Sequence, residues 1–437
     1  MNVSSWGRFP SANHERCQTM HWRHQPPDPT SRPSFLPYGL GRSYGDVCLN
    51  DGADLLLTRG LGRFIAFDDR QGILTAEAGV SLAEVLALTV PKGWFPPVTP
   101  GTAQVTLGGM VANDVHGKNH HHDGSFGHHV LELGLWRSAE GYQTCSPEQH
   151  QELFRATIGG LGMTGLITQI TFKLIPITSP MMTVETHAFR DLDGFLSLTE
   201  SSDQKFRYTV AWIDTCQLKH GCRGIFFRGN HSERGDRTQI PAKSYPWRMP
   251  FRAPSLLLNR SSICAFNFFY FHHHRFHAAQ TQQHYHPFFY PLDKIANWNL
   301  LYGKRGPLQY QCVVPGEKAL IMLFKIVAEA KQVSFLTVLK KFGSLEAPGD
   351  LSFPRPGFTL AMDFPISRKV FALCDALDAE VMAAGGAVYP AKDARMPAEN
   401  FPVFFPNWRK WEAQLDRQFS SSFYRRAVEP NLKGKAS

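Results

Sequence analysis

Two glycine-rich stretches, set about 60 residues apart, constrain this 437-residue chain more than any other feature. The first is LPYGLGRSYGD at residues 36–46, and the second is PGTAQVTLGGMVANDVHGKN at residues 100–119. Glycine permits a positive φ and a close approach of the backbone, so successive amides can point at phosphate oxygens. Each stretch therefore predicts a backbone cradle for a diphosphate, and the pair predicts one long cofactor held from two sides.

Neither stretch matches the two best-known phosphate motifs. The glycines of the first stretch are not followed by the Gly-Lys-Ser/Thr ending of a P-loop. They also lack the third glycine and the helical pattern of a dinucleotide-binding βαβ unit. The embedded Arg42, His116 and Lys118 add groups that can contact a charged ligand.

The composition is that of a folded chain, large enough for two domains, with an excess of basic residues. Hydrophobic residues make up 43% and charged residues 19%, which excludes global disorder. The formal charge of +9 indicates a phosphorylated substrate, a polyanionic cofactor or simply a basic surface. We expect no nucleic-acid partner, because no basic run interleaved with aromatic residues appears.

The cysteines and histidines favour neither disulfides nor a metal. The eight cysteines are scattered, and only Cys216 and Cys222 lie close together, so no disulfide framework or zinc site is expected. The histidine runs at 120–122 and 272–277 are expected in loops. Adjacent histidines in a loop rarely give the defined geometry that a metal site needs, so we expect no metal. Without a signal-peptide core or the about 18 apolar residues of a spanning helix, we expect a cytoplasmic protein or one peripheral at the membrane.

Local patterns predict an α+β fold. Residues 72–79 are typical of a strand, and Ser81 with Glu84 forms a capping box ahead of a helix. Alternation over 170–174 predicts a half-buried strand, and the apolar spacing over 371–382 predicts a second helix. We place the first domain boundary near residue 178.

Residues 245–290 form an aromatic segment that fits none of these patterns. The segment is too aromatic for a solvated loop and too broken by proline for a regular core element. We expect a mobile apolar flap over a substrate channel, a surface that touches a membrane, or an irregular buried connection.

Seven motifs, in one order over nearly the whole chain, resemble the flavin-dependent oxidases of the vanillyl-alcohol-oxidase type. They are residues 37–46, 99–102, 116–121, 124–127, 308–311, 363–366 and 391–395. The resemblance is strongest to the members that oxidise a polyprenyl-phosphoryl ribose. It implies an FAD-binding domain of the PCMH type in two parts, 1–178 and 387–437. Between them, at 179–386, it implies an inserted α+β substrate domain built on an antiparallel sheet.

The resemblance implies FAD as the cofactor and a set of residues around it. The set is Pro37, Tyr38, Gly39, Leu40, Gly41, Arg42, Ser43, Tyr44, Gly45, Asp46, Val47, Gly101, Thr106, Leu107, Gly108, Gly109, Asn113, Asp114, Val115, His116, Ile167 and Tyr389. We expect the amides of 39–43 and 106–109 to bind the pyrophosphate. In many relatives a histidine directly before the loop serine bonds covalently to the flavin. Arg42 stands there, so we expect non-covalent FAD.

Lys392, His116 and Tyr44 are the catalytic candidates. Lys392 is expected to hold a cation near the flavin ring and the substrate. His116 is expected to take a proton or to position the sugar, and Tyr44 to pack by the flavin. The expected substrate-binding residues are Lys118, Gln309, Gln311 and Lys392, with Asn299 and Tyr302 as further candidates.

The function that the resemblance implies is oxidation of the 2-hydroxyl of a polyprenyl-phosphoryl ribose to a keto sugar. An NAD(P)H-dependent short-chain reductase would then complete an epimerisation toward polyprenyl-phosphoryl arabinose, a precursor of the cell envelope. Two alternatives remain open. One is a soluble FAD-dependent alditol or sugar-lactone oxidase that uses oxygen, and the other is a peripheral membrane scaffold with a vestigial flavin fold.

Overall fold

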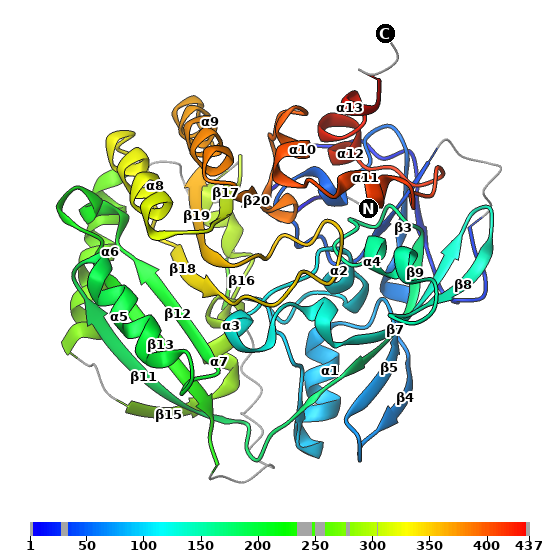
Figure 1. The fold of residues 1–437 in the computed structure, drawn as a ribbon, viewed down its shortest axis with the longest axis horizontal. Coiled ribbons are helices and arrows are strands. Elements are labelled where there is room, and N and C mark those ends of the chain that lie inside the picture. Colours follow the sequence, from blue (N-terminus) through cyan, green and yellow to red (C-terminus); the bar gives the residue numbers. More distant parts are fainter. Residues whose placement is uncertain are drawn as a thin grey trace.

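The computed structural model describes residues 3–27, 34–233, 247–249, 258–276, 280–303 and 305–433. It confirms the predicted α+β class, because helices pack on two large sheets whose strands are all antiparallel neighbours. Figure 1 shows the eight-stranded sheet on one side of the molecule and the five-stranded sheet on the other. The predicted boundaries near 178 and 386 remain predictions.

A small parallel sheet leads into the first glycine-rich stretch. Its strands β1 (Cys17–Thr19) and β2 (Phe35–Tyr38) flank β3 (Asp54–Leu57). Phe35, Leu36 and Leu55 are buried, which fixes the end of β2. The chain therefore enters residues 39–46 from a rigid support.

The five-stranded sheet has the order β4-β5-β9-β7-β8. Its strands are β4 (Phe64–Asp68), β5 (Ile73–Glu77), β7 (Val130–Arg137), β8 (Gly141–Cys145) and β9 (Leu166–Lys173). Ile170 and Phe172 of β9 are buried whereas Thr171 is not, as the alternation predicts. The short strands β6 (Trp94–Phe95) and β10 (Ile175–Pro176) form a separate pair.

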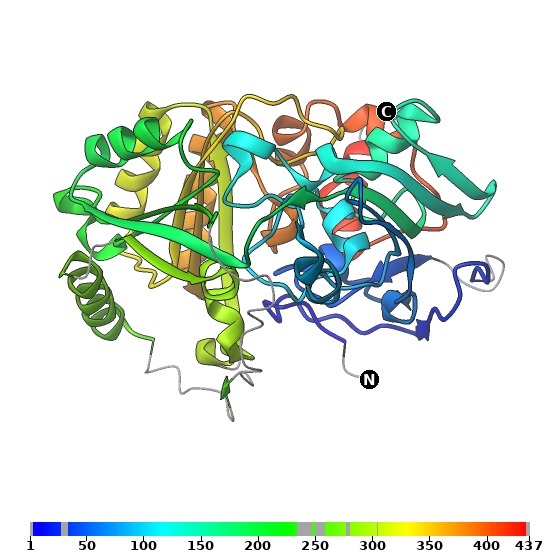
Figure 2. The ribbon, with the colours of Figure 1, turned by 90° about the horizontal axis from the view of Figure 1, so that it is seen from below.

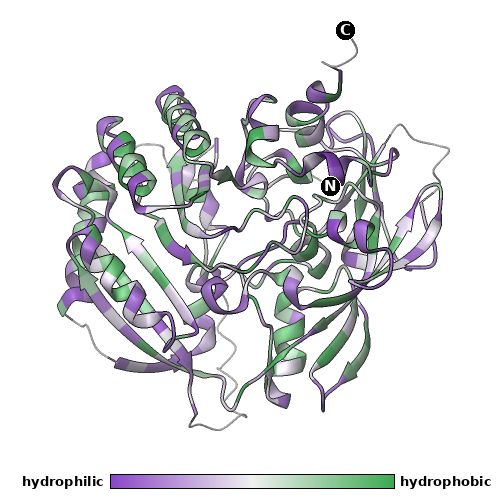
Figure 3. Cartoon of the chain, viewed as in Figure 1, coloured by the Kyte–Doolittle hydropathy of each residue, from purple (hydrophilic) through white to green (hydrophobic). Residues whose placement is uncertain are grey.

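The predicted capping box begins α1 (Leu82–Thr89). The Ser81 hydroxyl accepts from the Glu84 amide, and the Glu84 carboxylate accepts from the Ser81 amide at 2.7 Å. Leu82, Val85 and Leu86 are buried, in keeping with the mainly apolar colouring of α1 in Figure 3. Further helices of this part are α2 (Leu107–Ala112), α3 (His120–Asp123) and α4 (Gln151–Thr157).

The eight-stranded antiparallel sheet has the order β15-β11-β13-β12-β18-β19-β17-β20. The strands are β11 (Met181–Phe189), β12 (Tyr208–Ile213), β13 (Gly224–His231), β15 (Gln280–His284), β17 (Pro307–Val314), β18 (Thr337–Phe342), β19 (Gly357–Pro365) and β20 (Ala387–Val388). The helices α5 (Leu192–Ser202), α8 (Glu317–Glu329) and α9 (Arg368–Ala383) share its hydrophobic core. The helix predicted over 371–382 is thus confirmed. A minor parallel pair joins β14 (Trp247–Arg248) to β16 (Ile295–Ala296), and α7 is Tyr285–Phe289.

The aromatic segment contains regular structure, so the expectation of an irregular buried connection is wrong for residues 260–276, whereas the mobile flap and the membrane-touching surface stay predictions. α6 (Arg260–Phe276) is a helix of 17 residues. Pro246, Pro250 and Pro254 all precede it, so no proline interrupts its hydrogen bonds. Residues 245–246, 250–257 and 277–279 of the segment lie outside the described residues. No helix in the described ranges is long and apolar enough to cross a membrane.

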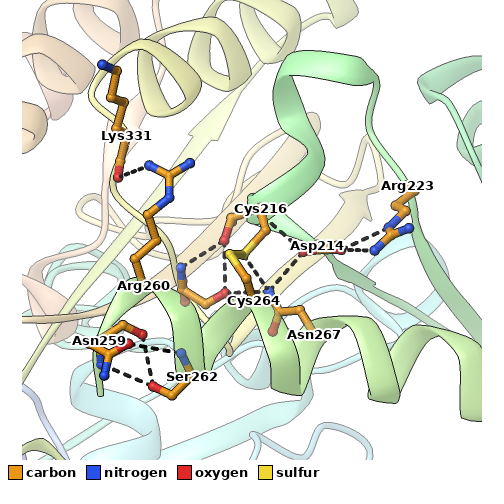
Figure 4. Close-up of a disulfide and its surroundings, with 11 residues drawn as sticks. Asp214, Cys216, Arg223, Asn259, Arg260, Ser262, Cys264, Asn267 and Lys331 are labelled. Carbon is orange, nitrogen blue, oxygen red and sulfur yellow. Dashed lines mark hydrogen bonds and ion pairs between the residues drawn. A yellow bond between two sulfur atoms is a disulfide. The ribbon is translucent and has the colours of Figure 1, made fainter. Parts of the chain in front are cut away.

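A disulfide joins Cys216 to Cys264, which the scattered cysteine positions did not predict. The two residues are 48 positions apart, and only the packing of α6 against the turn at Thr215–His220 brings them together. Figure 4 shows the bond between α6 and this turn. The expectation of no disulfide is therefore wrong for this one pair, and the other six cysteines are free.

The C-terminal residues return to the first glycine-rich stretch. They form α10 (Asn400–Phe404), α11 (Trp408–Glu412), α12 (Ser422–Ala427) and α13 (Pro430–Lys433), which Figure 1 shows beside β3. From α12, Arg426 donates to Asp46 at 2.7 and 2.9 Å and to Asp393 at 2.9 Å. Both carboxylates are buried, so this arginine joins three distant parts of the chain.

Replacing this buried cation should destabilise the fold strongly. We expect Arg426→Met to lower the free energy of unfolding by about 3–5 kcal/mol, because it removes the cation that pairs with the buried carboxylates of Asp46 and Asp393. Lys433→Met is the matched control: it removes an exposed pair with Glu429, and its cost should stay below about 1 kcal/mol. Denaturant unfolding of both variants measures the difference. Equal losses would contradict the role given to Arg426.

Candidate active site

The two glycine-rich stretches contact each other. A Cβ placed on Gly39 would lie 2.3 Å from Thr106 Oγ1, so only glycine allows this approach. Arg42 Nε donates to the Gln104 carbonyl at 3.0 Å. The stretches thus lie side by side, as one shared ligand requires.

The amides of residues 39–43 fit a diphosphate. Within the described part of the chain, no group accepts a hydrogen bond from them. Gly41 has φ +60°, and a Cβ there would lie 2.0 Å from Tyr38 Oη. Consecutive free amides around such a turn form a concave anion site. This loop is therefore suited to the pyrophosphate of FAD.

The amides of the second stretch do not fit in the same way. Those of Leu107 and Gly108 donate to the carbonyls of Val80 and Ala78 at 2.8 Å, and that of Gly109 donates to Thr106 Oγ1 at 3.2 Å. The prediction that these three amides bind the pyrophosphate is wrong, because the turn before α1 uses those of Leu107 and Gly108, and the Thr106 side chain at the start of α2 uses that of Gly109. Residues 106–109 can face a cofactor only through other atoms.

Several predicted cofactor residues have structural roles in the first stretch. Pro37 and Tyr38 belong to β2, and Tyr38 Oη donates to the Ser4 carbonyl at 2.8 Å. Leu40 and Ser43 are half-buried, whereas Asp46 and Val47 are buried. Gly45 packs so closely that a Cβ would lie 1.6 Å from the Asp393 carbonyl oxygen.

The other predicted cofactor residues are spread over three elements. Gly101 is exposed, with no atom within 4 Å of where a Cβ would lie. Asp114 is buried with φ +38° and accepts from the Gly127 amide at 2.9 Å. Val115 accepts from the Phe126 amide at 2.8 Å. Ile167 is buried in β9 opposite Leu135.

Tyr389 links the second stretch to the C-terminal segment. Its hydroxyl donates to the Asn113 carbonyl at 2.8 Å, and its amide donates to the Gln311 carbonyl at 2.9 Å. Its ring stacks on Phe353 at 4.6 Å and lies 5.2 Å from the ring of His116. Phe353, which no sequence motif singled out, thus packs against the rings of both Tyr389 and His116.

Lys392 and Tyr44 face each other. Lys392 Nζ lies 4.2 Å from the centre of the Tyr44 ring, and the Tyr44 amide donates to the Ala391 carbonyl at 2.9 Å. Burial lowers the pKa of Lys392 to about 8, and the nearby Asp363 partly offsets that effect. Two of the three catalytic candidates are therefore in contact.

Asp363 is the carboxylate beside Lys392. It lies on β19 opposite Gln309 of β17, whose amide nitrogen donates to Asp363 Oδ1. Burial raises the pKa of Asp363 to about 7, while Gln309 and Lys392 act in the opposite direction. The motif at 363–366 had marked this residue without giving it a role.

His116 is buried and held by Gln311. Its Nε2 lies 2.9 Å from Gln311 Nε2, which also donates to Thr359 Oγ1 at 3.2 Å. Burial, and then the neighbouring Lys340, His120 and Lys392, hold its pKa well below the usual value. The ring is thus neutral at pH 7. With Gln311 as donor, Nε2 accepts and Nδ1 carries the hydrogen, which has no acceptor among the described residues.

Two further lysines lie near His116. Lys118 Nζ donates to the Phe288 carbonyl and lies 4.3 Å from the Phe288 ring centre. Lys340 of β18 donates to the Gly117 carbonyl at 3.4 Å. Burial, and then the other lysines, lower the pKa of Lys118 to about 7 and of Lys340 to about 8. Lys340 was not among the predicted site residues, because its residue type does not distinguish it from the neighbouring Lys341.

Asn299 and Tyr302 lie at the margin of the site. Asn299 Nδ2 donates to the Trp6 carbonyl at 2.8 Å, so it fixes the N-terminal segment. Tyr302 is buried and stacks on Phe335 at 5.8 Å. Burial, with Asp363 and Tyr44 nearby, raises its pKa.

The site therefore combines a backbone anion cradle, a neutral histidine, the pair of Lys392 with Asp363, and two further lysines, Lys340 and Lys118. Such a site can hold a dinucleotide and an anionic substrate and can stabilise negative charge as it develops. Within the described residues, no three metal-binding side chains cluster. The arrangement agrees with redox chemistry carried by an organic cofactor.

Comparison with known proteins agrees with this geometry. A family model described as an FAD binding domain matches residues 30–146, which include both glycine-rich stretches. Decaprenylphosphoryl-beta-D-ribose oxidase of Mycolicibacterium smegmatis is 33% identical over 411 residues, covering 89% of this chain and 88% of that protein. An uncharacterized protein of the mprA 5' region of Streptomyces coelicolor is 31% identical and covers 79% of this chain and 99% of its own.

The lactone oxidases are more distant. A putative D-arabinono-1,4-lactone oxidase of Neurospora crassa is 28% identical over 141 residues, covering 32% of this chain and 25% of that protein. The cofactor is FAD, and the chain belongs to the family of FAD-dependent oxidoreductases that includes decaprenylphosphoryl-β-D-ribose oxidase.

Proposed function

We propose that this protein oxidises the 2-hydroxyl of a polyprenyl-phosphoryl ribose to a keto sugar. The observation that carries the proposal is the likeness to an oxidase of decaprenylphosphoryl ribose over 89% of the chain. The charge of the site supports it, because Lys118, Lys340 and Lys392 are neighbouring cations that can neutralise a phosphate. A lactone has no such charge to neutralise, and the D-arabinono-1,4-lactone oxidases match only 32% and 44% of the chain.

We further propose that FAD is bound without a covalent bond, between residues 1–178 and 387–437, with 179–386 as the substrate domain. FAD bound there would supply the acceptor for the two electrons and the hydrogen that leave the carbinol carbon. Arg42 stands 4.5 Å over the Trp6 ring and donates to Gln104, so it supports the loop. A guanidinium is not a nucleophile that could bond to the flavin.

The chain's own groups have separate roles in this proposal. Lys392 holds positive charge beside the reacting centre, and Asp363 keeps its ammonium in place. His116 donates from Nδ1 to the substrate oxygen and adds no charge, because its ring is neutral. Tyr44 packs under Lys392, and Gln309 with Gln311 orients Asp363 and His116. Lys118 and Lys340 bind the phosphate.

Two partners belong to the proposal. An NAD(P)H-dependent short-chain reductase would reduce the keto sugar to the epimer, which gives the arabinose configuration. A membrane is the second partner, because a polyprenyl tail keeps the substrate in a lipid phase.

Removing the cation of Lys392 should stop turnover and leave the cofactor bound. We expect Lys392→Met to lower kcat by about 10²–10³-fold, as loss of one charge-stabilising group does. The measurement is anaerobic bleaching of the flavin absorbance after mixing with a polyprenyl-phosphoryl ribose. Lys341→Met is the control, since Lys341 lies next to Lys340 but pairs with Asp203. A yellow Lys392→Met protein with normal turnover would contradict the role.

Lys340 should act on substrate binding. We expect Lys340→Met to raise KM about tenfold or more with a smaller change in kcat, because a hydrogen bond to a charged group contributes about 1.5–3 kcal/mol. KM of Lys341→Met should stay at the wild-type value. A tenfold rise in both variants would point to a general effect of surface charge instead.

The rate should fall at alkaline pH. Lys392 has a pKa lowered to about 8, so its cation is present below this pH and is lost as pH rises through it. We therefore expect kcat to fall as pH rises through about 8, and Lys392→Arg to move the fall to higher pH. A rate that increases through the same range would instead show that the neutral amine acts as a base.

A further inference from the structure

α6 has two faces of opposite character. Ile263, Asn267 and Phe271, spaced by four residues, are buried against the eight-stranded sheet. On the opposite side, Phe269 and Phe276 are 70% and 74% exposed, two turns apart. Figures 1 and 2 show α6 at the outside of this sheet. Large aromatic side chains so exposed on one helix face mark an interaction surface.

The helix is fixed, so its aromatic side chains cannot turn into the core. Cys264 is bonded to Cys216, and Asn267 Nδ2 donates to Asp214 Oδ1 at 3.0 Å and to the Ser334 carbonyl at 3.2 Å. Asp214 is held in turn by Arg223 at 2.7 and 2.9 Å, as Figure 4 shows. These contacts hold one side of α6 against the rest of the protein, so the other side faces outward.

The charge of α6 has one sign. Its 17 residues contain Arg260, Arg275 and three histidines but no aspartate or glutamate. Arg275 is exposed beside Phe276, with its guanidinium 5.8 Å from the ring centre. Phe268 and Phe266 extend the apolar face at 49% and 48% exposure. Aromatic residues flanked by basic ones are the composition of helices that lie in a lipid interface and contact anionic headgroups.

We propose that the outer face of α6 docks this protein on an anionic lipid surface. The proposal rests on the proposed function, because a substrate with a polyprenyl tail stays in a bilayer. The sheet under α6 also carries Gln309, Gln311 and Lys340, so one rigid body joins the docking helix to the substrate residues.

The test is co-sedimentation of the full-length FAD-loaded protein with vesicles of equal parts phosphatidylcholine and phosphatidylglycerol. Wild type should bind these vesicles and bind pure phosphatidylcholine less. Phe269→Ser/Phe276→Ser should lower the partition coefficient at least about tenfold, since each phenylalanine loses its apolar burial in lipid. Ile321→Ser/Met322→Ser is the matched control: these residues of α8 are each 40% exposed, and the variant should bind as wild type does.

A second variant keeps the test independent of folding. Arg275→Glu removes no apolar area and should weaken binding to the anionic vesicles only. Flavin absorbance and melting temperature report whether each variant is folded. Absence of wild-type binding, or equal binding by the phenylalanine variant, would overturn the proposal. A wild-type dimer that Phe269→Ser/Phe276→Ser dissociates would overturn it in favour of a contact between copies.

Vesicle binding and the proposed function can fail separately. Binding is measured without substrate, so a protein that docks on lipid but oxidises only free sugars refutes the function alone. Turnover of a short-chain, water-soluble phosphoryl ribose should be unchanged in the phenylalanine variant. Loss of that turnover would place the two residues in the active site and would overturn the docking role.

Discussion

The site depends on the contact between the first glycine-rich stretch and the C-terminal segment. The Tyr44 amide donates to the Ala391 carbonyl, and Gly45 lies against the Asp393 carbonyl so closely that no other residue would fit. Arg426 closes the same junction by binding the buried Asp46 and Asp393. Because Lys392 lies between two of these fixed points, its ammonium has to face Tyr44. More than 340 residues of chain separate the two sides, so the tertiary fold alone creates the reaction centre.

The electrostatics of the centre follow from burial. Lys392 lies beside the carboxylate of Asp363, Lys340 is a charged neighbour of Lys392, and Lys118 is a charged neighbour of Lys340. Desolvation opposes charge on all four groups: the pKa of each lysine is lowered and that of Asp363 is raised. A site of this kind costs folding free energy, because like charges are held together away from water. An anionic ligand reverses that cost, since it supplies the missing negative charge. The excess of positive charge that costs folding free energy therefore favours the binding of a phosphate.

The sequence predicted what local patterns and fixed motifs encode. The capping box at Ser81 and Glu84, the strand at 170–174 and the helix at 371–382 depend on neighbouring residues, and each is confirmed. The free amides of 39–43 agree with the glycine pattern, but those of 107 and 108 are used by the turn before α1, which no local signal reveals. The amide of 109 is used by the side chain of Thr106. The same limit explains the missed disulfide, because Cys216 and Cys264 meet only through packing. Lys340 was missed since strand alternation, not residue type, separates it from Lys341. In the aromatic segment, prolines before residue 258 concealed an uninterrupted helix.

The predicted cofactor residues and the predicted substrate residues lie mostly in different parts of the chain. The FAD binding domain model matches residues 30–146, which hold both glycine-rich stretches. Gln309, Gln311, Lys340 and Asp363 all lie outside that match, on β17, β18 and β19 of one antiparallel sheet. Because the strands are bonded to each other, a change at one of these positions moves the others little. Under the proposed function, substrate choice can therefore change by substitution on this sheet without a change in the loop at 39–43 or in the contacts of Arg426.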